Sequence, residues 1–276
     1  MRVTLLLFLL VLSRYSFAHS VEWITLDFPP YYIVDDKREG LGRDEAVIQL
    51  LNQALKEYTV SSIMMPASRA IYALRDTDKL RCLISLYKTN DRAQYLHFSS
   101  EYSTIGLPIT VALKRATLNK LKLKENSAIS LKMLLKDDAL HLGFTENRAF
   151  GLEIDNVLKS AEQSQLEARP GGDALRSLTM MLLKDRVDLV LGYASEHFYA
   201  KQLQDPDDEL TQLSLTETPE LSFGYVGCSR HEDSVDYLNR VDEVLRKLHV
   251  DNRFHEIMLR WLPEGLKSNL NYHLEK

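Results

Sequence analysis

The run Arg81-Cys82-Leu83-Ile84-Ser85-Leu86-Tyr87-Lys88-Thr89-Asn90-Asp91-Arg92 passes from a short apolar segment into a polar turn. The apolar half is typical of a buried strand. The turn ends in an arginine, and Phe98-Ser99-Ser100-Glu101-Tyr102 then opens a second extended segment. An arginine held just past a strand end is well placed to bind a carboxylate through both prongs of its guanidinium. A lone arginine in a turn is more often a surface residue, so other segments must decide between the two interpretations.

The N-terminus has the pattern of a secretory signal peptide, which we assign to residues 1–18. Met1-Arg2 is a short basic start, Val3 to Leu12 is almost entirely apolar, and Ser16-Phe17-Ala18 supplies small residues before a cleavage site. The apolar run is too short for a stable membrane span, and no second one follows it. We therefore expect a mature chain that begins near residue 19, lies outside the cytoplasm and is not inserted in a membrane.

The charge of the chain restricts its partners. Removal of residues 1–18 takes away two arginines and no acid, so the formal net charge changes from −5 to −7. An acidic protein is poorly suited to binding nucleic acid or an anionic membrane. The remaining residues are enough for one large domain or for two lobes.

The chain has two cysteines, and each lies in or at the end of an apolar, strand-like run. In an oxidising compartment, two cysteines favour one disulfide. We expect Cys82 and Cys228 to be bridged, with two separate buried thiols as the alternative.

Strand-like and helix-like segments alternate along the chain, which is typical of an α/β protein. A first strand at Val21–Leu26 ends in a proline-rich loop, and a helix follows from Asp44 to about residue 58. The middle of the chain repeats the pattern. It has a strand at Ala139–Phe144, a helix from Arg148 to about residue 162, and a strand at Val187–Leu191.

Several short motifs together resemble the periplasmic solute-binding proteins of the amino-acid-binding type, family 3. The turn at Thr89–Arg92 and the segment at Phe98–Tyr102 resemble the family's Thr-x-x-Arg…Phe-Ser-x-x-Tyr signature. Phe28-Pro29-Pro30-Tyr31, followed by Gly40-Leu41-Gly42-Arg43-Asp44, resembles its aromatic-x-Pro-aromatic…Gly-aromatic-x-x-Asp opening. The resemblance spans nearly the whole mature chain.

The resemblance implies a two-lobed α/β fold of the type 2 periplasmic binding class, with two chain crossovers and a ligand cleft between the lobes. On this plan residues 19–112 and 222–276 form lobe 1, and residues 113–221 form lobe 2. The implied partners are a small-molecule ligand and, separately, an ABC permease or a membrane receptor. We expect a monomer without a cofactor.

The resemblance also implies ligand contacts in lobe 1. Phe28 matches the aromatic residue that stacks on the ligand, and Arg92 matches the carboxylate clamp. Ser85 and Tyr87 match positions that offer hydroxyl and backbone groups. For the two tyrosines after Phe28, ordinary packing of the loop is an equal alternative. The lobe 1 candidates are Phe28, Tyr31, Tyr32, Arg69, Ser85, Tyr87 and Arg92.

In lobe 2, the family presents free backbone amides at a helix N-terminus to the same carboxylate. The matching turn here has Arg148 just before Ala149, the residue that replaces the family's threonine. A cation at a helix N-terminus is electrostatically unfavourable unless an anion occupies the site. Arg148 and its neighbour Asn147 are therefore ligand candidates, with a solvent-facing arginine as the alternative.

The largest departure from the family is Tyr193, which stands where the amino-acid binders have an aspartate for the ligand's ammonium group. A tyrosine does not supply that charge. Together with Arg148, this predicts a carboxylate-bearing or otherwise anionic small ligand, not a plain α-amino acid. Asp27-Phe28-Pro29-Pro30 and Arg148-Ala149-Phe150-Gly151 also resemble a branch of secreted proteobacterial members, which weakens the link to transport.

We therefore predict a solute-binding protein that captures its ligand between two lobes for uptake or sensing. One alternative is a dehydratase-like enzyme on the same fold, which would need a positioned acid or base such as Glu101 or Glu146. Another is a sensory module whose closed, ligand-bound form binds a membrane receptor. No metal site is expected, because the histidines lack ligand spacing: His249 and His255 are six residues apart, and one helical face needs three or four.

Overall fold

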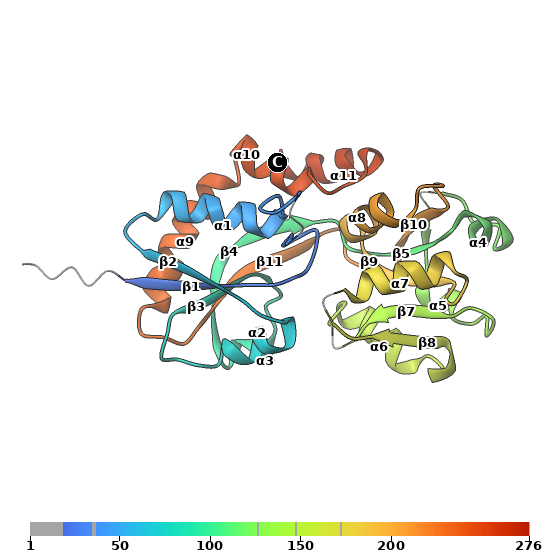
Figure 1. Cartoon of the computed structure of the whole chain (residues 1–276), viewed down its shortest axis with the longest axis horizontal. Coiled ribbons are helices and arrows are strands. Elements are labelled where there is room, and N and C mark those ends of the chain that lie inside the picture. Colours follow the sequence, from blue (N-terminus) through green and yellow to red (C-terminus); the bar gives the residue numbers. More distant parts are fainter. Residues whose placement is uncertain (1–18, 35–36, 126, 147, 172, 276) are drawn as a thin grey trace, which may run out of the picture.

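The structure is a computed structural model that describes residues 19–34, 37–125, 127–146, 148–171 and 173–275. The assigned signal peptide and the candidate Asn147 lie outside these residues. The described strands form two separate sheets, each with its own helices, and the two α/β lobes lie side by side (Figure 1).

Lobe 1 contains the N-terminal and C-terminal parts of the chain. Its strands are β1 (Ser20–Thr25), β2 (Thr59–Met64), β3 (Arg81–Leu86), β4 (Leu96–Gly106) and β11 (Ser222–Ser229). Its helices are α1 (Arg43–Ala54), α2 (Ala67–Ala73), α3 (Asn90–Ala93), α9 (Ser234–Leu248), α10 (Asn252–Leu259) and α11 (Glu264–Leu274). The strand order is β2-β1-β3-β11-β4, and β11 runs antiparallel to both of its neighbours.

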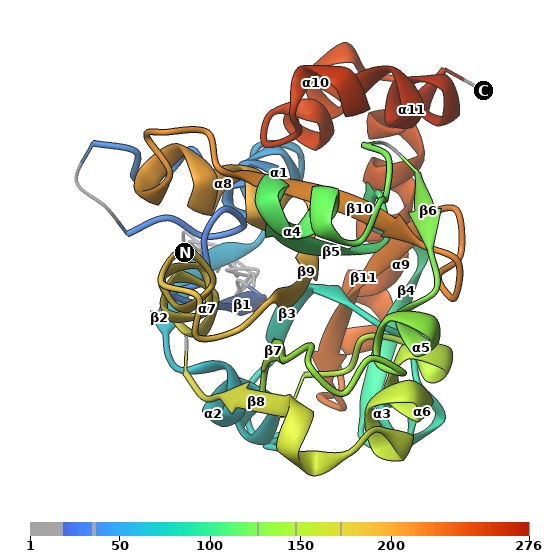
Figure 2. The ribbon, with the colours of Figure 1, turned by 90° about the vertical axis from the view of Figure 1, so that its right-hand side faces the viewer.

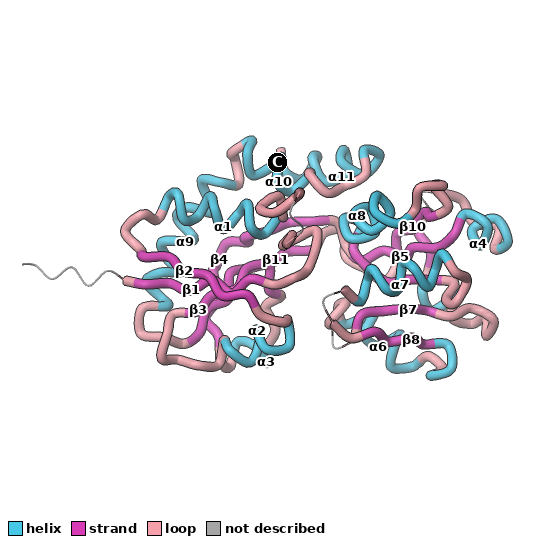
Figure 3. The backbone as a smooth tube through the Cα atoms, in the orientation of Figure 1, coloured by secondary structure: helices cyan, strands magenta, loops and turns pink. Residues whose placement is uncertain are grey.

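Lobe 2 is formed by the middle of the chain. Its strands are β5 (Ile109–Lys114), β6 (Ala128–Ile129), β7 (Leu142–Thr145), β8 (Leu166–Arg169), β9 (Leu189–Tyr193) and β10 (Leu210–Leu215). Its α-helices are α4 (Arg115–Lys120), α5 (Leu131–Leu134), α6 (Leu152–Ser160), α7 (Ala174–Leu183) and α8 (Ala194–Gln204), and Gln163–Gln165 forms a 3-10 turn. The strand order is β6-β10-β5-β9-β7-β8. Figure 3 shows how helices and strands alternate in both lobes.

The chain crosses between the lobes twice, once between β4 and β5 and once between β10 and β11. Strand β5 pairs with β9 on one edge and with β10 on the other, so the whole strand belongs to the second sheet. Residues 109–112, which the sequence analysis put in lobe 1, therefore lie in lobe 2. The change of sheet falls at Leu107-Pro108, where proline has no N–H to continue a ladder.

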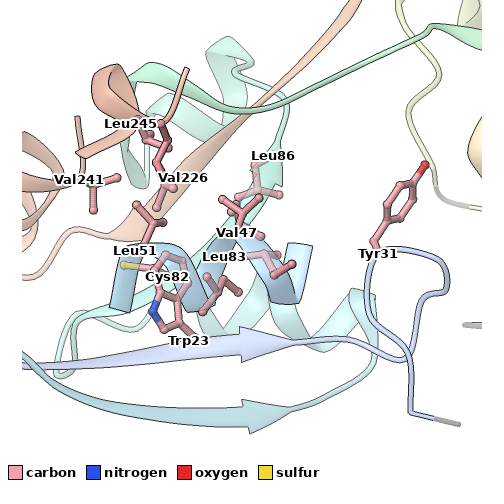
Figure 4. Close-up of a cluster of buried hydrophobic side chains, with 14 of the residues drawn as sticks. Trp23, Tyr31, Val47, Leu51, Cys82, Leu83, Leu86, Val226, Val241 and Leu245 are labelled. Carbon is pink, nitrogen blue, oxygen red and sulfur yellow. The ribbon is translucent and has the colours of Figure 1, made fainter. Parts of the chain in front are cut away.

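Apolar side chains from the sheet and from α1 and α9 fill the core of lobe 1. Figure 4 shows Trp23 of β1, Val47 and Leu51 of α1, and Val241 and Leu245 of α9 within this cluster. All five are at most 1% exposed. Val47 and Leu51 are four residues apart, as are Val241 and Leu245, so each pair lies on one face of its helix, and burial of that face fixes both helices on the sheet.

A small apolar cluster also joins the two lobes. Tyr199 of α8 packs with Ile33 and Trp261 of lobe 1, and the Tyr199 and Trp261 ring centroids are 5.2 Å apart. The Trp261 indole N–H donates a hydrogen bond to the carbonyl oxygen of Leu41 at 3.0 Å. Figure 2, which looks onto lobe 2, shows the loop before α1 passing beside α8.

A disulfide ties the returning strand β11 to β3. Cys82 and Cys228 are paired residues in the antiparallel register, their sulfurs are bonded, and both are fully buried. They are 146 residues apart in the sequence. The bond therefore closes a loop that contains all of lobe 2.

Replacing both cysteines by alanine should lower the free energy of unfolding by about 2–5 kcal/mol, because a crosslink over a long loop restricts the unfolded chain. Denaturant unfolding of the wild type and of Cys82→Ala/Cys228→Ala, each with and without reductant, measures the difference. Reductant should destabilise the wild type and leave the variant unchanged. A variant as stable as the oxidised wild type would contradict the expected role of the bond.

Candidate functional site

A cavity of about 1220 Å³ is lined by both lobes. Lobe 1 contributes the loop after β1, the end of β3, α3 and part of β4. Lobe 2 contributes the turns after β7 and β8 and the end of β9. The ends of strands in open α/β sheets are where ligands bind, because loops and helix starts converge there.

Eight of the ten candidate ligand residues line this cavity: Phe28, Tyr31, Tyr32, Ser85, Tyr87, Arg92, Arg148 and Tyr193. Arg69 is exposed on α2 and is not among the described lining residues, although Ala67 and Ile71 of the same helix are. Asn147 lies outside the described residues. The structure thus brings the loop after β1, the β3 run and the lobe 2 turn together around one space.

Arg92 enters the cavity from the short helix α3. Thr89 caps this helix by accepting a hydrogen bond from the Arg92 backbone N–H at 3.2 Å. The Arg92 guanidinium donates to the Tyr87 carbonyl oxygen at 3.0 Å. Among the described residues no carboxylate lies within ion-pair distance of Arg92. Most of its donors are therefore available to a ligand.

Arg43 also lines the cavity, and the sequence analysis missed its role. Its Nε donates to Asp44 Oδ1 at 2.8 Å, its Nη2 donates to Ser85 Oγ at 3.2 Å, and the guanidinium lies 4.3 Å from the Tyr31 ring centroid. Burial acts to lower the pKa of Arg43, but the Asp44 carboxylate outweighs this and leaves that pKa above its ordinary value. Asp44 is buried beside Arg43, and its carboxylate balances the charge of the guanidinium. The pair therefore adds no net charge to the cavity wall.

Ser85 has an unusual backbone conformation. Its φ of 62° lies in the left-handed region, which non-glycine residues rarely adopt outside functional or tightly packed sites. Its hydroxyl is 2.9 Å from Thr104 Oγ1. A Cβ at Gly224 of β11 would lie 2.6 Å from Ser85 Cα, so β11 comes this close only because residue 224 is glycine. Ser85 is thus packed closely against β11, and its hydroxyl lies next to Thr104 of the strand beyond it, β4.

The structure corrects the predicted position of Arg148. Helix α6 begins at Leu152, not at Arg148, because its N-cap Gly151 has a φ of 103°, outside the helical range. Arg148 therefore lies in the turn after β7 and not at the helix N-terminus. The argument that the helix dipole requires an anion beside Arg148 does not apply.

Arg148 instead pairs with Glu196 of α8. Its Nη2 donates to Oε1 at 2.6 Å and its Nη1 donates to Oε2 at 3.0 Å. The Glu196 side chain is fully buried, and that of Arg148 is 15% exposed. Burial acts to raise the pKa of Glu196, but the charge and hydrogen bonds of Arg148 outweigh it and hold that pKa below its ordinary value. Both groups are therefore charged and neutralise each other.

Two tyrosine contacts cross between the lobes. The hydroxyl groups of Tyr87 and Tyr193 are hydrogen-bonded, and Tyr31 Oη is 3.2 Å from Ser195 Oγ. Burial raises the pKa of Tyr31 and of Tyr193 well above the ordinary value, so both hydroxyls are neutral. They line the cavity as hydrogen-bonding groups without charge.

Comparison with known proteins agrees with this geometry. The family model of bacterial extracellular solute-binding proteins, family 3, matches residues 23–264. The chain belongs to this family. The comparison with curated proteins gives no match.

Among the described residues, no helix is both long and apolar enough to cross a membrane.

Solved structures show the same fold as this family 3 protein. A histidine kinase sensor domain with similarity to periplasmic binding proteins matches with a TM-score of 0.65 and 15% identity, over 88% of this chain and 96% of its own. An amino acid ABC transporter substrate-binding protein from Streptococcus pneumoniae, bound to L-arginine, matches with a TM-score of 0.62 and 16% identity, over 88% and 93%. The P235GK mutant of ArgBP from T. maritima matches with a TM-score of 0.63 and 14% identity, over 88% and 95%.

The two glutamates named for an enzyme alternative lie apart in this family 3 protein. Glu101 pairs with Arg246 at 3.3 Å and is not among the described cavity-lining residues. Glu146 lines the cavity but is exposed. Among the described residues, no group of three or more His, Cys, Asp or Glu side chains is placed to hold a metal ion.

His197 lies behind the cavity, next to Glu196. A Cβ at Gly192 would come within 2.8 Å of His197 Cε1, so β9 and the first turn of α8 are closely packed. Burial lowers the pKa of His197 to about 4, and its Nε2 has no hydrogen-bond partner among the described residues. The histidine is therefore neutral near pH 7.

The pKa of His197 predicts a loss of stability in weak acid. The unfolded chain takes up this proton near the ordinary pKa of about 6.5, whereas the folded protein resists it down to about 4. The stability from neutral His197 is complete above pH 6.5 and is lost as the pH falls towards 4. Between pH 6.5 and 5 the wild type should lose about 1.5 kcal/mol more than His197→Gln.

Urea unfolding at several pH values in this window measures the loss. The range stops at pH 5 because the depressed pKa of Glu196 adds a loss of its own at lower pH. His141→Gln, a change at a residue with a 49% exposed side chain, is the matched control and should follow the wild type. Equal pH slopes for the wild type and His197→Gln would show that His197 is not the cause.

Proposed function

We propose that this protein binds a small carboxylate-bearing ligand between its lobes and closes around it in the periplasm, after secretion directed by residues 1–18. The loaded protein would then engage a separate membrane partner, either an ABC permease for uptake or a receptor for sensing. Membership of an extracellular solute-binding family supports the binding role and the location. The structural neighbours include both a transporter's binding protein and a kinase sensor domain, which supports either kind of partner.

The observation that carries the proposal is the unpaired guanidinium of Arg92. Arg43 and Arg148 line the same cavity, but buried carboxylates neutralise both. Arg92 has only its bond to a carbonyl oxygen among the described residues, so its charge is free for a ligand anion. A planar guanidinium binds a carboxylate in a bidentate, charge-assisted way. Arg75 also lines the cavity, but it is exposed and lies over the Tyr95 ring, so we assign the carboxylate to Arg92.

The remaining wall of the cavity suits such a ligand. Phe28, Tyr31 and Tyr87 offer aromatic surface around the cavity, and Tyr87 and Tyr193 add hydroxyl groups. Thr145 and Tyr32 also line it, and each has a buried hydroxyl without a hydrogen-bond partner in the described residues. Such unsatisfied groups are costly unless something binds them. A ligand with polar atoms besides its carboxylate would satisfy them.

Thermal unfolding against a panel of small carboxylates and their neutral amides tests the proposal. A carboxylate that binds only the folded protein raises the unfolding midpoint, and its amide should not. Arg92→Ala should weaken binding by about 10- to 100-fold, the range for loss of a hydrogen bond to a charged group. Titration of the midpoint against ligand concentration gives the affinity of each variant.

Arg75→Ala is the matched control, because Arg75 also lines the cavity but is exposed and lies over the Tyr95 ring at 4.1 Å. This variant should keep the wild-type shift. If no carboxylate shifts the midpoint, or if Arg92→Ala keeps the full shift, the proposed role of Arg92 is wrong.

A further inference from the structure

The guanidinium of Arg148 is held in the way that proteins hold a bound cation. It lies 5.0 Å from the ring centroid of Phe28, 5.0 Å from that of Tyr193 and 5.6 Å from that of Phe150. Glu196 binds it in a bidentate manner. Aromatic faces and a paired carboxylate are together the chemistry that recognises a guanidinium or ammonium group.

The carboxylate of this pair is shielded from the cavity by the arginine. Arg148 is among the lining residues and Glu196 is not, and the Glu196 side chain is fully buried. Glu196 Oε2 also accepts a hydrogen bond from the Tyr193 backbone N–H at 3.0 Å, which fixes its orientation. A buried carboxylate stays ionised only if a cation compensates it. In this cleft Arg148, a residue of the same chain, supplies the charge that compensates Glu196.

The cage around Arg148 contains residues of both lobes. Glu196, Tyr193 and Phe150 belong to lobe 2, whereas Phe28 comes from the loop after β1 in lobe 1. Arg148 itself lies in the irregular turn between β7 and Gly151. The side chain thus reaches from a turn of one lobe into the space where the two lobes meet.

We propose that Arg148 is a built-in occupant of a cation site formed by Glu196 and the rings of Phe28 and Tyr193, and that it makes the cleft select carboxylates without an adjacent ammonium or guanidinium group. With Arg148 in place, Glu196 is not available to a ligand cation, and the cation meets a like charge at this point of the cavity wall. This inference deepens the proposed function, and its selectivity for ligands rests on that function. The cation site itself does not depend on it.

Chemical rescue tests the cation site without the natural ligand. Arg148→Ala removes the guanidinium and leaves Glu196 with an empty cage, so ethylguanidinium should bind there. The unfolding midpoint of Arg148→Ala should rise by roughly 3–6 °C at ten times the dissociation constant of ethylguanidinium. The wild type, whose site is filled, should show no rise. Ethylurea and sodium chloride at the same concentrations control for shape and ionic strength.

The matched variant Arg148→Ala/Glu196→Gln has the same empty space without the acid, and it should not respond to ethylguanidinium. An equal rise in the single and the double variant, or no rise in a folded Arg148→Ala, overturns the inference.

If Arg148→Ala does not fold, Glu196→Gln gives the test in reverse, because it leaves the Arg148 charge unpaired. Acetate should then raise the midpoint of Glu196→Gln more than that of the wild type. An equal effect of acetate on both proteins overturns the inference.

Succinate and aspartate test the selectivity, since they differ only by an ammonium group. The wild type should bind succinate more tightly than aspartate, and Arg148→Ala should reduce or reverse that preference. An unchanged preference in Arg148→Ala overturns the selective role of Arg148. If neither acid nor any other carboxylate of the panel binds the wild type, the proposed function fails, and ethylguanidinium rescue still decides whether the cation site exists.

Discussion

The position of strand β11 is the constraint on which the cleft depends. The chain leaves lobe 1 after β4, builds all of lobe 2 and then returns to insert β11 between β3 and β4. Antiparallel pairing on both edges and the bond between Cys82 and Cys228 fix its register. The same strand approaches β3 at Gly224, where Ser85 takes its left-handed conformation. The strand that completes the lobe 1 sheet therefore also sets the local geometry of the binding wall at Ser85.

Much of the fold could be predicted because it follows from local patterns. The alternation of strands and helices agrees with the structure, and the family resemblance agrees with the family model. The first lobe boundary differed by a few residues because the sequence does not show which sheet the extended segment at 107–114 joins. Only pairing of Ile109–Lys114 with β9 and β10 assigns it to the second sheet. Pro108 was the local signal of the change.

The site was harder to predict, because its charges are set by contacts between distant segments. Tyr193 supplies no carboxylate, but a buried acid, Glu196, stands three residues later. Its sequence context, a residue at the third position of a helix, suggests capping, and Glu196 does accept the Tyr193 N–H. The bond to Arg148 spans 48 residues and has no local signature. The net charge of a cleft can be predicted only if it is known which acidic side chain pairs with which basic one.

The pairing of the arginines follows their burial. The side chains of Arg43 and Arg148 are 16% and 15% exposed, and each has a buried carboxylate partner. An unpaired charge at that depth would lose its hydration without compensation, so the partner is a condition for burial. Arg92, on a short helix at the cavity edge, is partly exposed, and water can hydrate it when no ligand is bound. A free cation is therefore expected only where solvent reaches, and a ligand carboxylate that displaces this water replaces hydration with a direct, bidentate bond.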